Sequence, residues 1–221
     1  MTIFSRYYDV DGTLQETTMD QLESLLEDEK NRDEIAMLIY RRYHDRYLKI
    51  FEYNASNSKL YFDEQGNEKV SSIFNMEYKN GFAMMVNCCL LIETLASFFI
   101  GNNKTPKEEG VKAYVEVFKK AEMYDNELKI FRNEPIYGCV RCGLFHQGET
   151  YGGFKIRRDG ISLFDKSTKT IDATKFCYWV NKLLESYRDE LSDTKAKWND
   201  VLWKNCKDKL IFIIKNTQSK S

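Results

Sequence analysis

The sequence lacks an excess of charge of either sign. Its 33 basic residues are balanced by 34 acidic ones, which gives a formal net charge of −1 at pH 7. Proteins that bind nucleic acid over a broad surface carry a surplus of lysine and arginine. The balance therefore argues against a generic polycationic nucleic-acid binder, and any contact with RNA would have to rest on a local basic patch.

The sequence also lacks the features of an exported or membrane-spanning protein. Its N-terminus has no basic segment followed by an apolar one, and the most apolar run is interrupted by Asn87 and Glu93. A transmembrane helix needs about 20 predominantly apolar residues in a row. The six cysteines, two of them adjacent, do not have the pattern of a secreted disulfide framework. We therefore expect a cytoplasmic protein with reduced cysteines and no membrane contact.

No repeat, low-complexity block or linker divides the chain. Its 221 residues, 43% of them apolar, are enough to bury a sizeable core. Apolar residues recur at helical spacing over most of the length. The pattern predicts a mainly α protein in which residues 1–221 form a single up-and-down helical bundle. The expected helices lie at about residues 19 or 32–53, 75–100, 111–124, 135–148, 171–191 and 194–214.

An N-terminal arm is predicted at residues 1–18, which alternate loosely around the turn dipeptide Asp11-Gly12. The segment from Asp9 to Thr13 also matches the DxDGT nucleophile motif of haloacid-dehalogenase-like phosphatases. That motif normally ends a buried parallel strand in an alternating β/α chain, and this sequence has no such context. We therefore favour a plain Asp-Gly turn.

A small β-hairpin is predicted after the helix at residues 135–148, at about residues 153–165, around the turn signal Asp159-Gly160. Its first half carries three basic side chains, Lys155, Arg157 and Arg158. Charged side chains protect an exposed edge strand from pairing with another chain. We favour that role over the alternative, in which the three side chains bind RNA phosphates.

The stretch from Pro135 to Glu149 contains Arg141 and His146, the best candidates for chemistry. Its proline suits the first turn of a helix, and Gly148 is a natural helix stop. With four residues between them, Arg141 and His146 lie roughly 140° apart on an ideal helix. A site that uses both therefore needs a wide groove, a helix end or a second copy of the chain. The apolar positions at helical spacing are Ile136, Val140, Leu144 and Phe145.

The helix expected at residues 75–100 is apolar nearly all round from Phe82 to Ile92, so it is predicted to be buried centrally. Glu93 follows directly. A carboxylate in such surroundings costs several kcal/mol unless it is protonated or meets a cation and further hydrogen bonds. Arg141 is the only cation within the apolar part of the helix expected at residues 135–148 and is the candidate partner. The alternative places Glu93 at an open rim without one.

The spacing from Arg141 to His146 resembles the R-x4-6-H motif of HEPN domains. These are small helical bundles that include many metal-independent ribonucleases of toxin and phage-defence systems. The helix start containing Tyr137 and the upstream apolar helix containing Glu93 also resemble the family's arrangement, which covers about residues 32–191. Many active members have a polar residue, commonly asparagine, where this sequence has Cys142.

The resemblance implies that two protomers bring their copies of Arg141 and His146 into one cleft, with an antitoxin or other regulatory protein as a further partner in toxin systems. RNA supplies its own nucleophile, the 2′-hydroxyl, so the protein needs only to move protons and stabilise a charged phosphorane. A histidine exchanges protons near neutral pH, and an arginine binds phosphate through its planar fork. Glu93, Tyr137, Cys142 and Gln147 are expected to support this pair.

We therefore expect an endoribonuclease that needs no metal and no cofactor. The alternative is a non-catalytic HEPN-like module that dimerises and binds a partner protein or nucleic acid.

Metal binding is a further alternative for the same stretch, because Cys139, Cys142 and His146 are spaced to share one helical stripe. A structural zinc site normally takes four protein ligands, and the fourth would have to be remote, such as Cys177. A catalytic zinc site would need a general base, for which only Glu149 is nearby. We favour free cysteines that act as small apolar residues.

Overall fold

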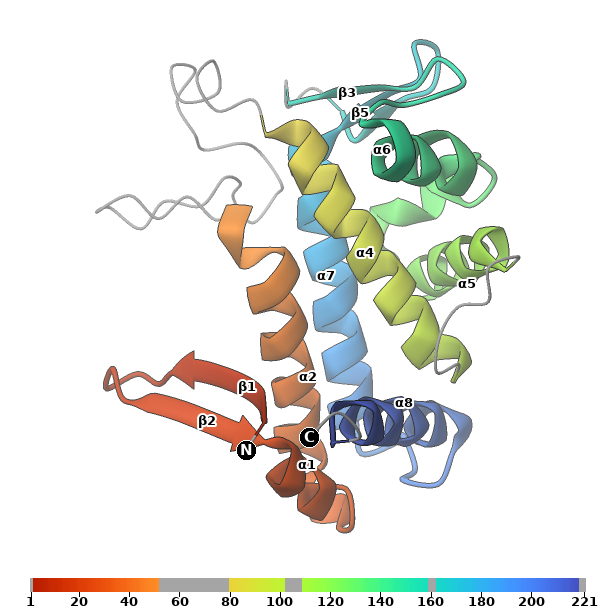
Figure 1. Ribbon diagram of the computed structural model, residues 1–221. Coiled ribbons are helices and arrows are strands. Elements are labelled where there is room, and N and C mark those ends of the chain that lie inside the picture. Colours follow the sequence, from red (N-terminus) through yellow and green to blue (C-terminus); the bar gives the residue numbers. More distant parts are fainter. Residues whose placement is uncertain (1, 52–79, 102–108, 159–161, 219–221) are drawn as a thin grey trace.

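Long helices supply most of the structure, as the sequence predicts (Figure 1). The computed structural model describes residues 2–51, 80–101, 109–158 and 162–218. The mainly α class is confirmed. The principal helices are α2 (Arg32–Tyr47), α4 (Gly81–Ile100), α5 (Gly110–Met123), α7 (Ala173–Ser192) and α8 (Val201–Gln218).

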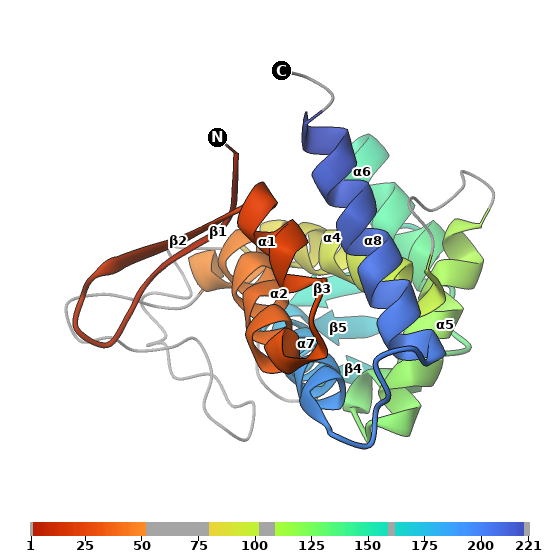
Figure 2. The same cartoon turned by 90° about the horizontal axis from the view of Figure 1, so that it is seen from below.

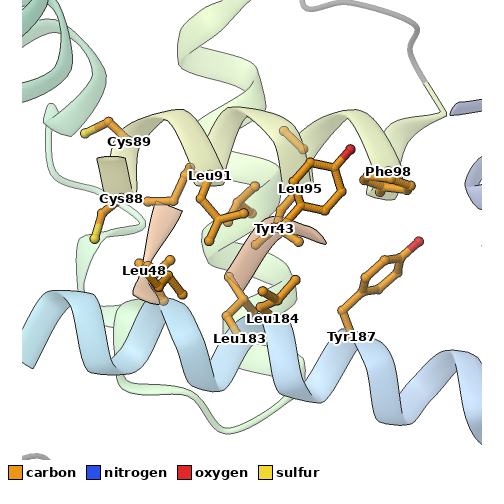
Figure 3. Close-up of a cluster of buried hydrophobic side chains, with 14 of the residues drawn as sticks. Tyr43, Leu48, Cys88, Cys89, Leu91, Leu95, Phe98, Leu183, Leu184 and Tyr187 are labelled. Carbon is orange, nitrogen blue, oxygen red and sulfur yellow. The ribbon is translucent and has the colours of Figure 1, made fainter. Parts of the chain in front are cut away.

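The core forms where α2, α4 and α7 pack against one another, while α5 and α8 cover other faces of α4 (Figures 1 and 2). Figure 3 shows side chains from all three central helices meeting between them. The ring of Phe98 on α4 lies 5.6 Å from that of Tyr43 on α2 and 5.8 Å from that of Tyr187 on α7. Because neighbours cover several of its faces, α4 must be apolar around most of its circumference.

Among the described residues, α4 is the one helix long and apolar enough to cross a membrane by length and composition. However, 56% of its most apolar stretch is buried inside the protein. Such burial is typical of a core helix.

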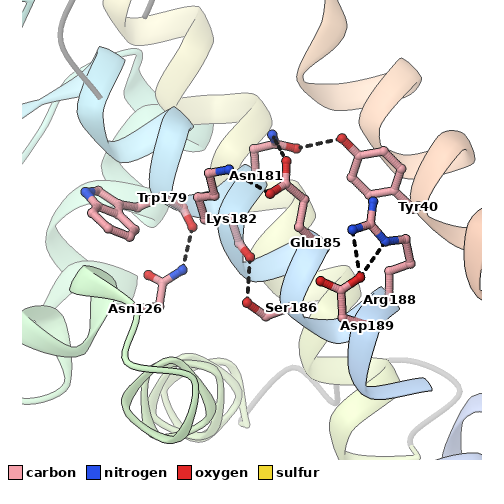
Figure 4. A network of polar contacts seen from close by, with 9 residues as sticks. All are labelled: Tyr40, Asn126, Trp179, Asn181, Lys182, Glu185, Ser186, Arg188 and Asp189. Atoms are coloured by element: carbon pink, nitrogen blue, oxygen red, sulfur yellow. Dashed lines mark hydrogen bonds and ion pairs between the residues drawn. The ribbon is translucent and has the colours of Figure 1, made fainter. Parts of the chain in front are cut away.

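Polar contacts attach the surrounding segments to α7 (Figure 4). The buried side chain of Asn126 accepts a hydrogen bond from the Leu128 amide at 2.9 Å and so begins η3 (Glu127–Phe131). Its amide group donates to the Trp179 carbonyl, also at 2.9 Å. One side chain therefore starts a short helix and holds it against α7.

The predicted N-terminal arm is an antiparallel hairpin of β1 (Ile3–Tyr8) and β2 (Leu14–Thr18). Gly12 has a φ of 77°, a left-handed conformation that favours glycine. The Asp9 carboxylate accepts hydrogen bonds from the amides of Asp11 and Thr13 at 3.0 and 2.8 Å. Its role is to close the turn, as we favoured, and no buried parallel strand precedes it in the described chain.

The β-hairpin predicted at residues 153–165 is wrong in its strand pairing. The structure has a mixed sheet in which β5 (Thr170–Asp172) lies between β3 (Lys155–Arg157) and β4 (Phe164–Asp165). β3 runs parallel to β5, and β4 runs antiparallel to it. All three residues of β5 are buried, which suits the central strand. The predicted turn at Asp159-Gly160 lies outside the described residues.

Several helix boundaries also differ from those predicted. The first segment is divided into α1 (Met19–Leu25), the short η1 (Glu29–Asn31) and α2, because Asp28 caps a new helical turn at the Lys30 amide. The last helix begins at Val201, later than the predicted residue 194. The predicted start of the central helix at residue 75 lies outside the described part of the chain. Asp172 caps α7 and accepts a hydrogen bond from the Lys175 amide at 2.7 Å.

The packing around α4 predicts a large loss of stability for Leu95→Ala, because Leu95 is 1% exposed between three helices. Deleting buried methyl groups removes contacts and leaves a cavity, so the free energy of unfolding should fall by about 2–5 kcal/mol. The matched control is Leu14→Ala on the hairpin, where the leucine is 42% exposed. It should change stability by no more than about 0.5 kcal/mol in urea denaturation. Equal losses in the two variants would contradict this description of the core.

Candidate functional site

The motif stretch folds as one turn of π-helix, η4 (Tyr137–Arg141), followed directly by α6 (Cys142–Gln147). The Cys142 amide donates to the Tyr137 carbonyl, the wide i to i+5 bond of a π-turn. The helix ends at Gly148 with a φ of 70°, at the stop that the sequence predicts. π-turns are rare and occur frequently at functional sites. The backbone therefore departs from regular α-helical geometry in the turn that ends at Arg141.

Arg141 pairs with Glu93 of α4, as predicted. Its Nε lies 2.5 Å from Glu93 Oε1, and its Nη2 lies 3.3 Å from Oε2. The two side chains are 19% and 22% exposed, so the ion pair is largely but not fully withdrawn from water. Nη1 has no hydrogen-bond partner among the described residues. The guanidinium is thus anchored on one edge and keeps donors on the other.

Aromatic rings hold the Arg141 side chain from other directions. Its guanidinium carbon lies 4.5 Å from the centre of the Phe145 ring and 5.5 Å from that of Tyr137. Burial acts to lower the pKa of Arg141, but the hydrogen bonds and charge of Glu93 outweigh it, and the pKa is raised above its ordinary value. Arg141 therefore stays cationic at any pH at which the protein is folded.

Tyr137 is itself positioned by α5. Its ring meets that of Tyr114 edge-on at 5.4 Å, and the buried Tyr114 hydroxyl donates to the Cys89 carbonyl of α4 at 3.2 Å. A Cβ on Gly110 would come within 2.0 Å of the Tyr137 ring, so only glycine allows this approach. Sequence reasoning missed Tyr114, because a tyrosine at an apolar helical position has no distinguishing signal.

His146 lies on α6, about one and a half helical turns beyond Arg141, the last residue of η4. Its side chain is exposed and has no hydrogen bond or ion pair with any described residue. Five positions along a helix correspond to roughly 140°, so Arg141 faces α4 while His146 does not. One chain therefore does not bring the two side chains together. Gln147 is also exposed, and Phe145, one of the apolar positions at helical spacing, is 36% exposed beside Arg141.

The basic strand β3 does not join Arg141. Arg158, directly after it, donates to Thr174 Oγ1 at 3.0 Å and to Asn80 Oδ1 at 2.7 Å, and so fastens the sheet to the beginnings of α7 and α4. Glu93 lies 13 positions after Asn80, which corresponds to about 20 Å along a helix. Lys155 and Arg157 are exposed on β3, an edge strand of its sheet, as the favoured interpretation of their charge predicts.

The cysteine and histidine stripe does not assemble into a cluster. Cys139 and Cys142 are half-buried, and Cys177 is buried in α7. Within the described ranges, no three His, Cys, Asp or Glu side chains lie close enough together to hold one metal ion. All six cysteines are free thiols.

The Glu93–Arg141 pair predicts energetic coupling between α4 and the motif helix. A double-mutant cycle of Glu93→Gln and Arg141→Gln should give a coupling of about 0.5–3 kcal/mol in the free energy of unfolding. A matched control is the exposed pair Glu116 and Lys119, whose side chains are 36% and 43% exposed. Its coupling should be about 0.3–0.5 kcal/mol, as for exposed pairs on helices. If the effects of the two single substitutions on the free energy of unfolding simply add, Glu93 and Arg141 do not stabilise the fold as a pair.

No protein-family model, curated protein or solved structure matches the chain. Any assignment of function therefore depends on the geometry of the site itself.

Proposed function

We propose that the protein is a metal-independent endoribonuclease whose site combines Arg141 of one copy with His146 of a second copy. The observation that carries this proposal is that the guanidinium of Arg141 is held in place and still has a donor available. Glu93 fixes its position through Nε and Nη2, and Nη1 is left without a partner in the described structure. An arginine held in this way presents its remaining donors to an anion without a further loss of side-chain freedom.

The proposed chemistry uses the RNA 2′-hydroxyl as nucleophile. His146 takes the proton from this hydroxyl or gives one to the leaving 5′-oxygen. Arg141 stabilises the charge that develops on the phosphorane oxygens. The 2′-oxygen forms a bond to phosphorus as the 5′-oxygen leaves, which gives a 2′,3′-cyclic phosphate and a 5′-hydroxyl. The exposed position of His146 supports this role because its ring is accessible to a large substrate.

A homodimer would bring Arg141 of one copy and His146 of the other together, although the two lie apart within one chain. In a symmetric pair, the same surface of each copy faces the other. An interface along α6 brings the exposed His146 of one copy toward the half-buried Arg141 of the other. The resemblance to HEPN domains, in which two motifs share a cleft, supports the same arrangement.

A non-catalytic HEPN-like module that binds a protein or nucleic acid is the second candidate. The observation that favours it is that the Glu93 carboxylate already neutralises Arg141. Cys142, which stands where many active members of the family have asparagine, is also half-buried rather than presented to solvent.

The first test of the activity is cleavage of RNA in excess chelator. The wild-type protein should cut RNA, leave 2′,3′-cyclic phosphate ends and fail on DNA, because DNA lacks the nucleophile. His146→Ala should lower the rate by about 10²–10⁴, the usual contribution of a general acid or base. The matched control is His44→Ala on α2, which removes the other histidine of the sequence and should cut at the wild-type rate. A wild-type protein inert on every RNA tried would favour the binding module.

The composite site makes a separate prediction about subunit mixing. Arg141→Ala and His146→Ala should each be inactive alone. When they are unfolded and refolded together, half of the dimers should be mixed, and each mixed dimer keeps one of its two sites. Activity should therefore return to about a quarter of the wild-type level. Light scattering at tens of micromolar should show a dimer; a monomer, or a mixture without activity, would contradict the shared site.

A further inference from the structure

A group of arginines separate from Arg141 lies where the N-terminal hairpin packs on α2, on the opposite side of the core from α5 (Figure 1). An open pocket of about 340 Å³ lies between the two elements. β1 contacts α2 directly, and both lie at one side of the molecule (Figures 1 and 2). The lining residues are Ile3, Phe4, Ser5, Arg6, Arg42, Asp45 and Arg46.

The pocket has a surplus of positive charge. Three arginines and one aspartate line it, which leaves two positive charges in excess. Arg6 is paired with Glu16 and Asp45 with Lys49, at 2.5 and 3.3 Å, so these neighbours add no net charge. Among the described residues, neither Arg42 nor Arg46 has a carboxylate within ion-pair distance. The excess is therefore carried by these two arginines of α2.

Arg42 is buried without a counter-charge. Arg42 is only 8% exposed, and its buried Nε has no hydrogen-bond partner among the described residues. Nη1 donates to the Phe4 carbonyl, and the guanidinium lies 4.3 Å from the centre of the Phe4 ring. A carbonyl and a ring are weak substitutes for an anion, because a buried charge needs both pairing and hydrogen bonds. Burial lowers the pKa of Arg42, and the charge of Arg46 lowers it further.

Two more features converge on the same space. Arg46 lies one helical turn after Arg42, and two like charges at this spacing destabilise a helix unless an anion is shared between them. Ser5 is 4% exposed, and its hydroxyl likewise has no hydrogen-bond partner in the described part of the chain. Buried hydroxyl groups without partners are costly and uncommon in folded proteins. Two unpartnered polar groups, from β1 and α2, thus line one cationic pocket.

We propose that this pocket binds a phosphate group, either free or as the phosphate of a small ester. A phosphate dianion matches the two excess charges, whereas a carboxylate would neutralise only one. Arg42 and Arg46 donate to its oxygens through their forks, and the Ser5 hydroxyl donates to a further oxygen. The site lies away from Arg141 and is independent of the proposed ribonuclease activity.

Thermal unfolding and calorimetric titration of the full chain test the site, with inorganic phosphate and a nucleoside 5′-monophosphate as probes. Sodium chloride at equal ionic strength is the reference for screening. The wild-type melting temperature should rise saturably with phosphate and not with chloride. Equal affinity for the two probes indicates free phosphate, and tighter binding of the nucleotide indicates an ester; both support the site.

Two variants assign the binding to the pocket. Arg46→Gln changes an exposed side chain and should weaken phosphate binding at least about tenfold, as expected for a lost charge-assisted hydrogen bond. The matched control is Arg132→Gln on the surface beside η3, where the arginine is 41% exposed, and it should bind phosphate like wild type. Ser5→Ala should also weaken binding several-fold, yet leave the ligand-free melting temperature unchanged or higher, because it removes a buried group without a partner.

The proposal is overturned if neither probe stabilises the wild-type protein more than chloride does. It is also overturned if Arg132→Gln loses as much affinity as Arg46→Gln, because the effect would then be general screening. Binding of an oligoribonucleotide through Arg46, with no binding of either small probe, would replace the small-ligand site by a surface for nucleic acid.

Discussion

The contact between Glu93 and Arg141 is the constraint on which the arrangement of the motif depends. α4 must be apolar around most of its surface because it packs against helices on several sides. A carboxylate withdrawn from water in that helix costs stability unless a cation pairs with it. Arg141 supplies the cation from the π-turn, and the rings of Tyr137 and Phe145 fill the space around it. This ion pair and these rings together hold Arg141 against α4.

The π-turn allows the segment from Tyr137 to Arg141 to hydrogen-bond with the loop that follows α6. It widens the backbone between Tyr137 and Arg141, and the Cys139 carbonyl accepts a hydrogen bond from the Tyr151 amide at 2.7 Å. The chain after α6 is thereby held close to the helix it has just left. A regular α-helix would direct that carbonyl to an amide within the helix. The irregular turn thus ties the loop, the motif helix and α4 together.

The sequence predicted what depends on local pattern or on the cost of a buried charge. Helical periodicity located α4, α5 and α7, Asp11-Gly12 located the hairpin turn, and Glu93 in an apolar helix identified its partner. Prediction from the sequence failed where strands distant in the chain could pair with the same neighbour in the small sheet. β5 takes the centre of the small sheet because its three residues are buried, yet in sequence they resemble only the start of the next helix. The exposed position of Phe145 likewise depends on Arg141 stacking against it, which periodicity does not encode.

The two arginine environments differ in how their charge is compensated. Arg141 meets a carboxylate of its own chain through two contacts, so its position is fixed without any ligand. Arg42 is more deeply buried. Its neighbours are the Phe4 carbonyl, the Phe4 ring, the Tyr43 hydroxyl and the like charge of Arg46, and no carboxylate of the described residues pairs with it. A folded chain keeps such an uncompensated charge only at a cost in stability. A bound anion at the proposed pocket of Ser5, Arg42 and Arg46 would offset that cost. Arg141 needs no such ligand, because Glu93 already compensates its charge and fixes its position.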